Sequence, residues 1–314
     1  MTSANRLKRV GVLGGAGYIG RHLASALATR NEPLELRVGV RTKENSIVRQ
    51  GIWDVDILDR CAVAKFLEGL DALFLMSGIS GTAKGFEEYA RYVEINEIGL
   101  LNVLDFCRKS NPACKIIFPS SRLVYQGKKG KALRENDILE PKTMYGLNKV
   151  ASESALAIYA KAYGTRFTVF RICVPYGQTT PGARAYGTMD HFLSQALKNG
   201  QIKIYGDGSQ RRTFTHINDL TSALIRAGLD SASDGVTYNI GGGDVLSIGE
   251  IADRIAEKFS ATVERVPWPD FDLRLESGDT IFDSSLLDSQ FQIGYEKTFD
   301  DWLEGLSKDS LKNL

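Results

Sequence analysis

The feature that most constrains this chain is a glycine-rich turn between an apolar run and an amphipathic run. The apolar residues 9–13 stop at Gly14, and residues 21–30 then place apolar side chains at helical spacing. Glycine permits a tight turn, lets backbone N–H groups approach a pyrophosphate, and allows close packing of helix on strand. The order strand, turn, helix therefore predicts a dinucleotide-binding unit, with the phosphates at the helix N-terminus. We expect it to contact the cofactor through Gly14, Gly17, Tyr18, Ile19 and Gly20.

The rest of the first half of the chain alternates strand-like and helix-like segments. We expect strands at residues 36–40, 72–76, 115–118 and 167–171, and helices at residues 98–107 and 149–163. Such alternation is typical of βαβ units, which build a parallel sheet with helices on both faces. The sequence thus predicts an α/β fold with a doubly wound parallel sheet of the Rossmann type.

The alternation becomes less regular after about Tyr176. Residues 177–187 are rich in glycine, threonine and arginine and predict a loop, while residues 248–259 predict a helix among short strands. We therefore expect a dinucleotide-binding domain over residues 1–175, with some later segments returning to it. Residues 176–314 are expected to form a smaller α/β substrate lobe.

Composition argues against several classes of function. Lysine and arginine number 39 against 38 aspartate and glutamate residues, so nothing favours nucleic acid or an anionic membrane as a partner. The three histidines and four cysteines show no metal-ligand spacing, and we expect no metal site. Scattered cysteines are typical of buried, reduced thiols in a cytosolic protein. Since the N-terminus is polar and no uncharged stretch approaches membrane-spanning length, we expect a soluble, cytoplasmic protein.

The residues after the second predicted strand bear on the choice of cofactor. Sites that prefer NAD place a carboxylate there for the ribose 2′-hydroxyl, whereas this chain has Arg41 and no carboxylate before Glu44. A guanidinium at that point would pair with a 2′-phosphate and stack on adenine, and Arg21 could assist. We therefore expect NADP(H) to be favoured. NAD(H) is the alternative, because Arg41 can also be a solvated surface residue. Asp56 and Ile57 are further expected contacts of the adenine.

Tyr145 and Lys149 stand four residues apart, which places them on one face of a helix. A phenol has an unperturbed pKa of about 10, and a neighbouring ammonium group favours its phenolate form. The pair therefore suits proton transfer to or from a reacting oxygen. Ser121, in a Ser-Ser pair at a predicted strand end, can hydrogen-bond that oxygen. Together with the glycine turn, these residues indicate hydride chemistry at a carbonyl or alcohol carbon.

These motifs resemble the extended short-chain dehydrogenase/reductase family, in its nucleotide-sugar epimerase, dehydratase and reductase branch. The resemblance spans nearly the whole chain, and its carriers are residues 14–20, 118–125, 145–149, 206–219 and 238–241. It implies that Ser121, Tyr145 and Lys149 are catalytic and that Lys149 also contacts the cofactor. It implies a nucleotide-sugar substrate bound by Ser121, Tyr145 and Arg212, the last of these on the pyrophosphate. It also implies a homodimer, whose helices near residues 87–108 and 149–163 form an intermolecular bundle.

Two departures from the family pattern narrow the expected reaction. Family dehydratases carry an Asp-Glu pair after the catalytic hydroxyl residue, whereas this chain has Arg122 and Leu123 there, so dehydration is not expected. The asparagine that usually precedes the Tyr-Gly of a later strand end is replaced by Val174, which removes one expected phosphate contact.

The expected reaction is therefore hydride transfer at the sugar's C4, and two activities share it. A 4-keto-reductase takes hydride from NADPH while Tyr145 protonates the new alkoxide, and a 4-epimerase oxidises C4 with tightly held NAD and then returns the hydride to the other face. Arg41 favours a reductase of a 4-keto-6-deoxy sugar nucleotide, although a loop insertion is expected before it at residues 31–35. An NADPH-dependent reductase of non-sugar ketones and a non-catalytic dinucleotide sensor are further alternatives. Arg212 argues against the reductase of non-sugar ketones, and the intact set of Ser121, Tyr145 and Lys149 argues against the non-catalytic sensor.

Overall fold

The computed structural model describes residues 8–41, 51–177, 187–308 and 311. The chain divides into two compact units. Unit 1 comprises residues 1–121, 143–171 and 224–238, and unit 2 comprises residues 122–142, 172–223 and 239–314. The two units therefore interleave along the chain, because residues 224–238 belong to unit 1 and residues 122–142 belong to unit 2. Most of the loop expected at 177–187 lies outside the described residues.

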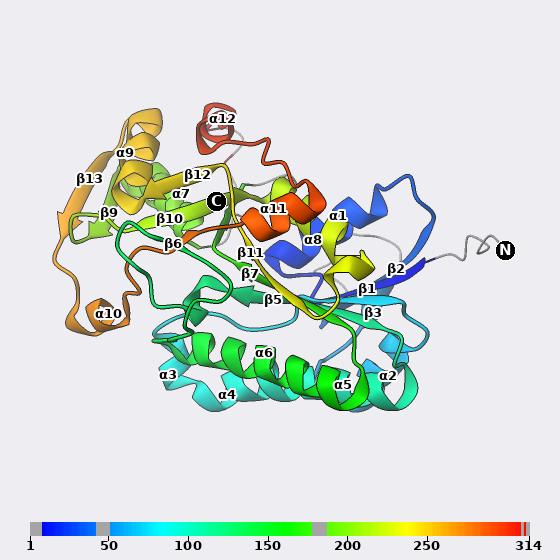
Figure 1. The fold of residues 1–314 in the computed structure, drawn as a ribbon. Coiled ribbons are helices and arrows are strands. Elements are labelled where there is room, and N and C mark those ends of the chain that lie inside the picture. The colour runs from blue at the N-terminus through cyan, green and yellow to red at the C-terminus, as the bar shows by residue number, and fades with distance from the viewer. Residues whose placement is uncertain (1–7, 42–50, 178–186, 309–310, 312–314) are drawn as a thin grey trace. The chain divides into compact units, whose positions relative to one another are not determined.

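Unit 1 is built on a seven-stranded sheet (Figure 1). In spatial order its strands are β11 (Val236–Ile240), β7 (Phe167–Ile172), β5 (Lys115–Ser121), β4 (Ala72–Leu75), β1 (Lys8–Leu13), β2 (Leu34–Val40) and β3 (Ile52–Asp54). β1 pairs in parallel with both β2 and β4, and the chain extends the sheet outward from β1 in both directions. The predicted doubly wound parallel sheet is confirmed.

Helices cover both faces of this sheet, which explains why its central strands are continuous apolar runs. On one face lie α1 (Tyr18–Ala28) and the end of α8 (Ile217–Gly228), where Gly228 lies against Phe74 and Ile117 (Figure 1). The other face carries α2 (Arg60–Leu67), α5 (Gly99–Ser110) and α6 (Met144–Tyr163). The shorter elements of unit 1 are α3 (Lys84–Glu87), α4 (Tyr89–Val93), η2 (Glu94–Ile98) and η4 (Ser231–Ser233).

The observed start of α6 corrects the expected one. The helix begins at Met144, five residues before the start predicted at residue 149, because Thr143 caps it. The Thr143 hydroxyl accepts a hydrogen bond from the N–H of Gly146 at 3.0 Å. Tyr145 therefore lies in the first turn of the helix that carries Lys149, so both residues share one rigid element.

Two strands also differ from their expected bounds. β5 continues to Ser121, beyond the end predicted at residue 118, so the serine pair is part of the strand. β2 begins at Leu34, and Leu34 and Glu35 therefore belong to the strand rather than to the insertion predicted at 31–35. The extension of β5 places Ser121 at the carboxyl end of the strand, whereas the extension of β2 lies at its amino end.

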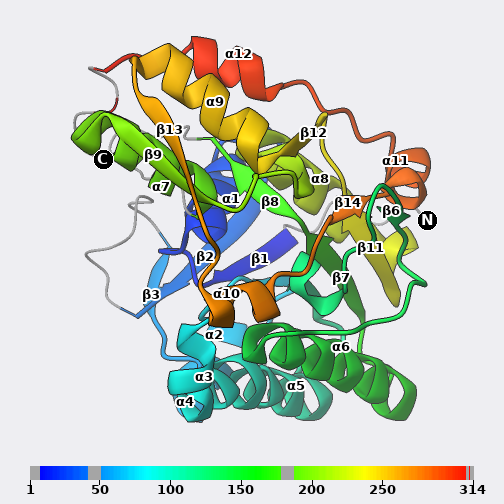
Figure 2. The same ribbon diagram turned by 90° about the vertical axis from the view of Figure 1, so that its left-hand side faces the viewer.

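Unit 2 contains smaller sheets in the part of the chain that the structure describes. One joins β12 (Asp244–Ser247), β10 (Arg211–His216) and β8 (Val174–Tyr176), and two-stranded sheets join β13 (Thr262–Val266) with β9 (Gln201–Tyr205) and β14 (Ile281–Phe282) with β6 (Ala132–Leu133). Helices α7 (Thr188–Asn199) and α9 (Ile248–Phe259) pack against β9 (Figure 2). Its shorter elements are η3 (Arg122–Val124), α10 (Asp270–Leu275), α11 (Ser285–Phe291) and α12 (Phe299–Glu304).

The structure bears on two expectations drawn from composition, namely those about membrane-spanning segments and about the cysteines. None of the helices in the described ranges is both long and apolar enough to cross a membrane. All four cysteines are free thiols, and Cys107, Cys114 and Cys173 are buried as expected. Cys61 is exposed, which corrects the expectation of buried thiols, because it lies in the first turn of α2 on the side away from the sheet core.

Candidate active site

The glycine turn connects the carboxyl end of β1 to the start of α1. The N–H groups of Gly14 and Gly15 donate to the carbonyl oxygen of Gly39 in β2 at 2.9 and 3.0 Å. Gly14 has a φ of +95°, and a Cβ on it would lie 2.4 Å from the backbone nitrogen of Ser77, just after β4. A Cβ on Gly20 would lie 2.2 Å from the carbonyl oxygen of Gly14. At positions 14 and 20 the packing of backbone on backbone therefore admits only glycine.

The same turn leaves space and hydrogen-bond donors for an anionic group. Gly17 is exposed, and a Cβ on it would approach only the carbonyl oxygen of Gly14, at 3.3 Å. As the N-cap of α1, Gly17 has no side chain to accept from the first-turn N–H groups. These donors and the positive end of the helix dipole are thus available to a ligand. The turn fits the pyrophosphate of a dinucleotide.

Tyr18 and Ile19, the other expected cofactor contacts on α1, are half-buried at its start. The Tyr18 ring packs edge-on against His22, with centroids 5.2 Å apart, and the Arg21 guanidinium lies 5.7 Å from its centre. Burial raises the pKa of Tyr18. Its phenol therefore stays protonated and supports the helix start by packing.

The expected adenine-end residues follow the carboxyl ends of β2 and β3, which are neighbours in the sheet. Arg41 is exposed directly after β2. Asp56 is exposed after β3 and accepts from the N–H of Leu58 at 2.9 Å, while Ile57 is buried in the core. Because parallel strands end at one edge, these residues lie at the edge where the glycine turn lies. That edge is where ligands bind in open α/β sheets.

Ser121, Tyr145 and Lys149 all belong to unit 1. Ser121 is the buried last residue of β5, Tyr145 is half-buried, and Lys149 is only 5% exposed one turn along α6. The Lys149 Nζ donates to the carbonyl oxygen of Pro119 at 2.7 Å and lies 5.6 Å from the centre of the Tyr145 ring. It also lies 4.4 Å from the centre of the Phe118 ring. One ammonium group thus joins α6 to the strand end that carries Ser121.

The charge state of Lys149 follows from its surroundings. Burial lowers the pKa of Lys149 to about 8, and the Glu153 carboxylate opposes this by favouring the charged form. The amine is therefore still mostly protonated at neutral pH. A positive charge beside the Tyr145 ring favours phenolate, so the pair can transfer a proton.

A buried ion pair adjoins this pair, and sequence reasoning missed it. Glu153 lies four residues after Lys149 on α6 and accepts from the Ser120 hydroxyl and from the Arg171 guanidinium, with Nη2 and Oε2 2.6 Å apart. Ser120 precedes Ser121, so the ion pair helps to fix the strand end. The signal was present in the sequence, because positions 145, 149 and 153 repeat every four residues along one helix face.

A second contact missed from the sequence holds the segment after β4. Asn96 lies buried in η2, a π-helical turn, and its amide accepts from the N–H of Ile79 at 2.9 Å and donates to the Ile79 carbonyl at 3.0 Å. Its amide nitrogen also lies 3.5 Å from the Asn148 side-chain oxygen on α6. Such turns are frequent at functional sites. Here the turn ties the segment beside the glycine turn to α6.

Arg212, expected to bind a pyrophosphate, lies on β10 in unit 2 and contacts the segment 276–280. Its Nη2 donates to Glu276 Oε1 at 2.8 Å, and its Nη1 donates to the Gly278 carbonyl at 2.9 Å and to Thr280 Oγ1 at 3.3 Å. The side chain is only 7% exposed. The guanidinium that the resemblance assigns to a pyrophosphate thus has a carboxylate partner in this structure.

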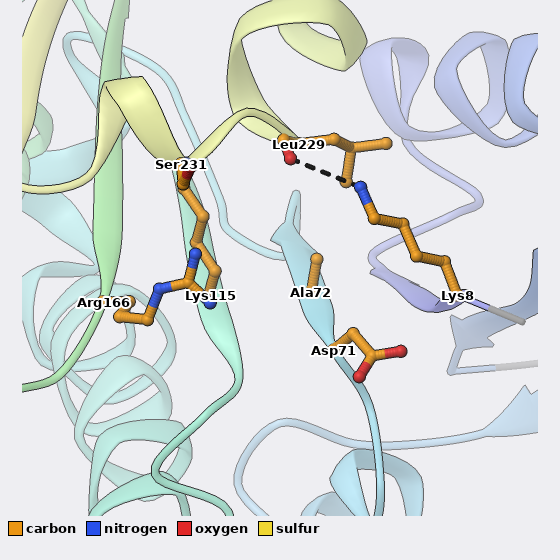
Figure 3. Close-up of a pocket in the computed structure, with 7 residues that line it drawn as sticks. All are labelled: Lys8, Asp71, Ala72, Lys115, Arg166, Leu229 and Ser231. Carbon is orange, nitrogen blue, oxygen red and sulfur yellow. Dashed lines mark hydrogen bonds between the residues drawn. The ribbon is translucent and has the colours of Figure 1, made fainter. Parts of the chain in front are cut away.

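A pocket of about 240 Å³ in unit 1 lies away from these groups (Figure 3). Lys8, Ala72 and Lys115, which line it, are the first residues of β1, β4 and β5. It therefore lies at the amino ends of the strands, whereas the glycine turn and Ser121 lie at the carboxyl ends. Figure 3 shows Lys8 reaching across it to the Leu229 carbonyl at 3.5 Å. Within the described ranges, no three His, Cys, Asp or Glu side chains form a group that could hold a metal.

Comparison with known proteins shows which family and which relatives the chain is similar to. A sequence model of the NAD dependent epimerase/dehydratase family matches residues 10–241. A UDP-N-acetyl-alpha-D-glucosaminuronate decarboxylase of Bacillus cytotoxicus is 29% identical over 274 residues, covering 83% of this chain and 84% of that protein. A putative UDP-glucose 4-epimerase of Methanocaldococcus jannaschii is 28% identical over 259 residues, covering 81% and 84%. The fold is also similar to that of the Bacillus cereus UDP-glucuronic acid 4-epimerase in complex with UDP-glucuronic acid and NAD, with a TM-score of 0.84, 24% identity and 97% and 99% coverage.

We expect Gly20→Ala to destabilise the protein by about 2 kcal/mol or more and to abolish dinucleotide binding. The added Cβ would lie 2.2 Å from the Gly14 carbonyl oxygen and would push α1 away from β1. Thermal unfolding with and without NAD measures both effects. Gly17→Ala is the matched control for stability, because its Cβ would lie 3.3 Å rather than 2.2 Å from the same oxygen, and it should destabilise the protein by less than about 1 kcal/mol. Equal destabilisation by the two substitutions would contradict this account of the turn.

The pKa of Lys149 predicts a pH-dependent cost to stability. The folded value of about 8 lies below the ordinary value of 10.5, so between them the unfolded state binds more protons and stability rises with pH. The lowered pKa reduces the free energy of unfolding by about 3 kcal/mol, and this reduction is fully present below pH 8. We expect the stability of Lys149→Met relative to the wild type to fall by most of this amount between about pH 7 and pH 10. Urea unfolding at both pH values measures it, and a pH-independent difference would refute it.

Proposed function

The chain belongs to the NAD dependent epimerase/dehydratase family, and on that premise we propose that it transfers hydride at C4 of a nucleotide sugar. The observation that carries the proposal is the Lys149 ammonium, which lies beside the Tyr145 ring and is bonded to the strand that ends at Ser121. These are the groups that a carbon–oxygen centre needs when hydride is exchanged, namely an acid–base group, a cation that tunes it, and a hydroxyl.

The nicotinamide cofactor accepts or supplies the hydride when it is bound at the glycine turn. In the oxidative direction Tyr145, as phenolate, takes the proton of the C4 hydroxyl, and in the reductive direction its phenol returns a proton to the C4 oxygen. Lys149 stabilises the phenolate by its positive charge. Ser121 donates a hydrogen bond to the C4 oxygen and so holds the reacting carbon in place.

Within this chemistry we favour 4-epimerisation. A relative is described as a putative UDP-glucose 4-epimerase, and a protein of similar fold is a 4-epimerase solved with NAD. A second candidate is a 4-keto-reductase of a 4-keto-6-deoxy sugar nucleotide that uses NADPH. The specific observation in its favour is Arg41, which is exposed directly after β2 at the position where an acidic residue would select NAD.

The proposal extends to assembly and location. We propose a homodimer formed by the helices at residues 87–108 and 149–163, because apolar side chains are exposed on them. These include Ile98, which is 45% exposed, and Ile158, which is 64% exposed. A reducing, cytoplasmic compartment is supported by four cysteines that form no disulfide.

We expect Tyr145→Phe to reduce turnover by about 10²-fold to 10⁴-fold while leaving cofactor affinity within about threefold. The substitution removes only the hydroxyl that transfers the proton. Rates with a UDP-sugar and titrations with NAD separate the two effects. Activity retained in this variant would remove Tyr145 from the proton transfer.

The choice of cofactor is tested on the purified protein. For an epimerase we expect NAD to be retained through purification and released on denaturation, whereas preferential binding of added NADPH would favour the reductase. Arg41→Asp should weaken NADPH binding by about tenfold or more and leave NADH binding unchanged, because only NADPH carries the 2′-phosphate. Calorimetric titration measures both affinities. Equal effects on the two nucleotides would show that Arg41 does not recognise the 2′-position.

A further inference from the structure

The charges of Lys149 and Glu153 lie on one face of α6 without bonding to each other. A lysine and a glutamate four residues apart on a helix are neighbours that ordinarily form an ion pair. The Lys149 ammonium instead donates to the Pro119 carbonyl at 2.7 Å, and among the described residues no hydrogen bond or ion pair joins it to Glu153. Both residues are buried, where opposite charges attract more strongly than in water. Another group must therefore hold the carboxylate.

That group is Arg171, on β7. Its Nε donates to Glu153 Oε1 at 3.1 Å and its Nη2 donates to Oε2 at 2.6 Å, which is the bidentate arrangement of a guanidinium on a carboxylate. The Ser120 hydroxyl also donates to Oε1. Arg171 is buried and belongs to unit 1, as its partners do. Both carboxylate oxygens are thus bonded to donors other than Lys149.

The place of the ammonium matters because Tyr145 and Glu153 lie on opposite sides of Lys149 along α6. Tyr145 is about one turn before Lys149, and Glu153 is about one turn after it. The Lys149 Nζ lies 5.6 Å from the centre of the Tyr145 ring, so an ammonium drawn to Glu153 would leave the phenol. The charge state agrees with this geometry. Burial lowers the pKa of Lys149 to about 8, whereas a direct bond to a carboxylate would raise it.

We propose that Arg171 is a positioning residue for the proton transfer, because its hold on both oxygens of Glu153 keeps the Lys149 ammonium beside Tyr145. Arg171 acts through Glu153 and not on the substrate. The planar fork of a guanidinium suits this task, since a lysine at position 171 would act as a point charge and leave one oxygen for Lys149. The consequence for turnover rests on the proposed function, whereas the consequence for the ammonium does not.

The first test replaces Arg171 by an uncharged side chain. In Arg171→Met we expect the freed Glu153 carboxylate to bond to Lys149 directly. The titration midpoint of Lys149 should then rise by about one pH unit or more, and turnover of UDP-glucose should fall by about tenfold or more. NMR titration of isotope-labelled lysine side chains, in the full chain with NAD present, measures the midpoint. The Lys149→Met variant identifies the resonance.

A rescue variant separates positioning from a merely structural role. Arg171→Met combined with Glu153→Gln removes both charges, and the glutamine still offers an oxygen to the Ser120 hydroxyl. Because no carboxylate then competes for the ammonium, the midpoint of Lys149 should return to the wild-type value or below it. Turnover should recover to at least about a third of the wild-type rate, since a buried ion pair can be replaced by neutral groups when both partners are removed together.

Arg166→Met is the matched control. Arg166 directly precedes β7, whereas Arg171 is near the end of the strand, and it pairs with Asp234 at 2.7 Å. This variant loses a guanidinium–carboxylate pair on the same strand at a distance from Lys149. It should change neither the midpoint of Lys149 nor turnover.

The outcomes separate this inference from the proposed function. An unchanged midpoint of Lys149 in Arg171→Met would overturn the inference, and so would a double variant no more active than the single one. Arg171→Lys covers a methionine variant that fails to fold. It should raise the midpoint by a smaller amount, and an unchanged midpoint there would also overturn the inference. A wild type without turnover would count against the proposed function alone, because the titrations still report where the ammonium lies.

Discussion

The hydrogen bond from the Lys149 ammonium to the Pro119 carbonyl is the contact on which the site in unit 1 depends. A buried charge without a partner costs several kcal/mol, so α6 cannot slide along the sheet without losing this bond. Glu153 supplies the opposing charge, and its partners Ser120 and Arg171 lie on β5 and β7. The contacts that hold the helix on the sheet therefore also fix Tyr145 relative to the strand that ends at Ser121.

The elements that could be predicted from the sequence are those specified by neighbouring residues. The glycine turn is one, because Gly20 is required by a backbone contact with Gly14, only a few residues before it in the chain. The helix predicted at 248–259 has these bounds in the structure, since Ser247 and Glu250 form a capping box at its start. The start of α6 was predicted too late, because its signal was a single threonine cap ahead of a tyrosine–glycine pair that is a weak helix former.

Contacts between distant residues could not be predicted in the same way. Asn96 and Ile79 meet because a π-helical turn directs one amide at the segment after β4, and no periodic pattern encodes such a turn. Arg212 and Glu276 are 64 residues apart and meet only because β10 bridges to Thr280. The assignment of residues 122–142 to unit 2 has the same origin, since it follows from the pairing of β6 with β14 and not from any local composition.

The charged side chains near the motif residues are arranged differently in the two units. Ser121, Tyr145 and Lys149 lie in unit 1, where Lys149 is bonded to Pro119 and Glu153 to Arg171 in the buried core, so a substitution at Lys149 costs stability. The cations Arg122 and Arg212 near residues 276–280 lie in unit 2, where Arg122 donates to the Ser277 hydroxyl. A substitution at such a position changes the local charge while the residues of unit 1 stay in place. Arg122 stands where family dehydratases carry an acid, so the charge at this position is reversed while Tyr145 and Lys149 are kept.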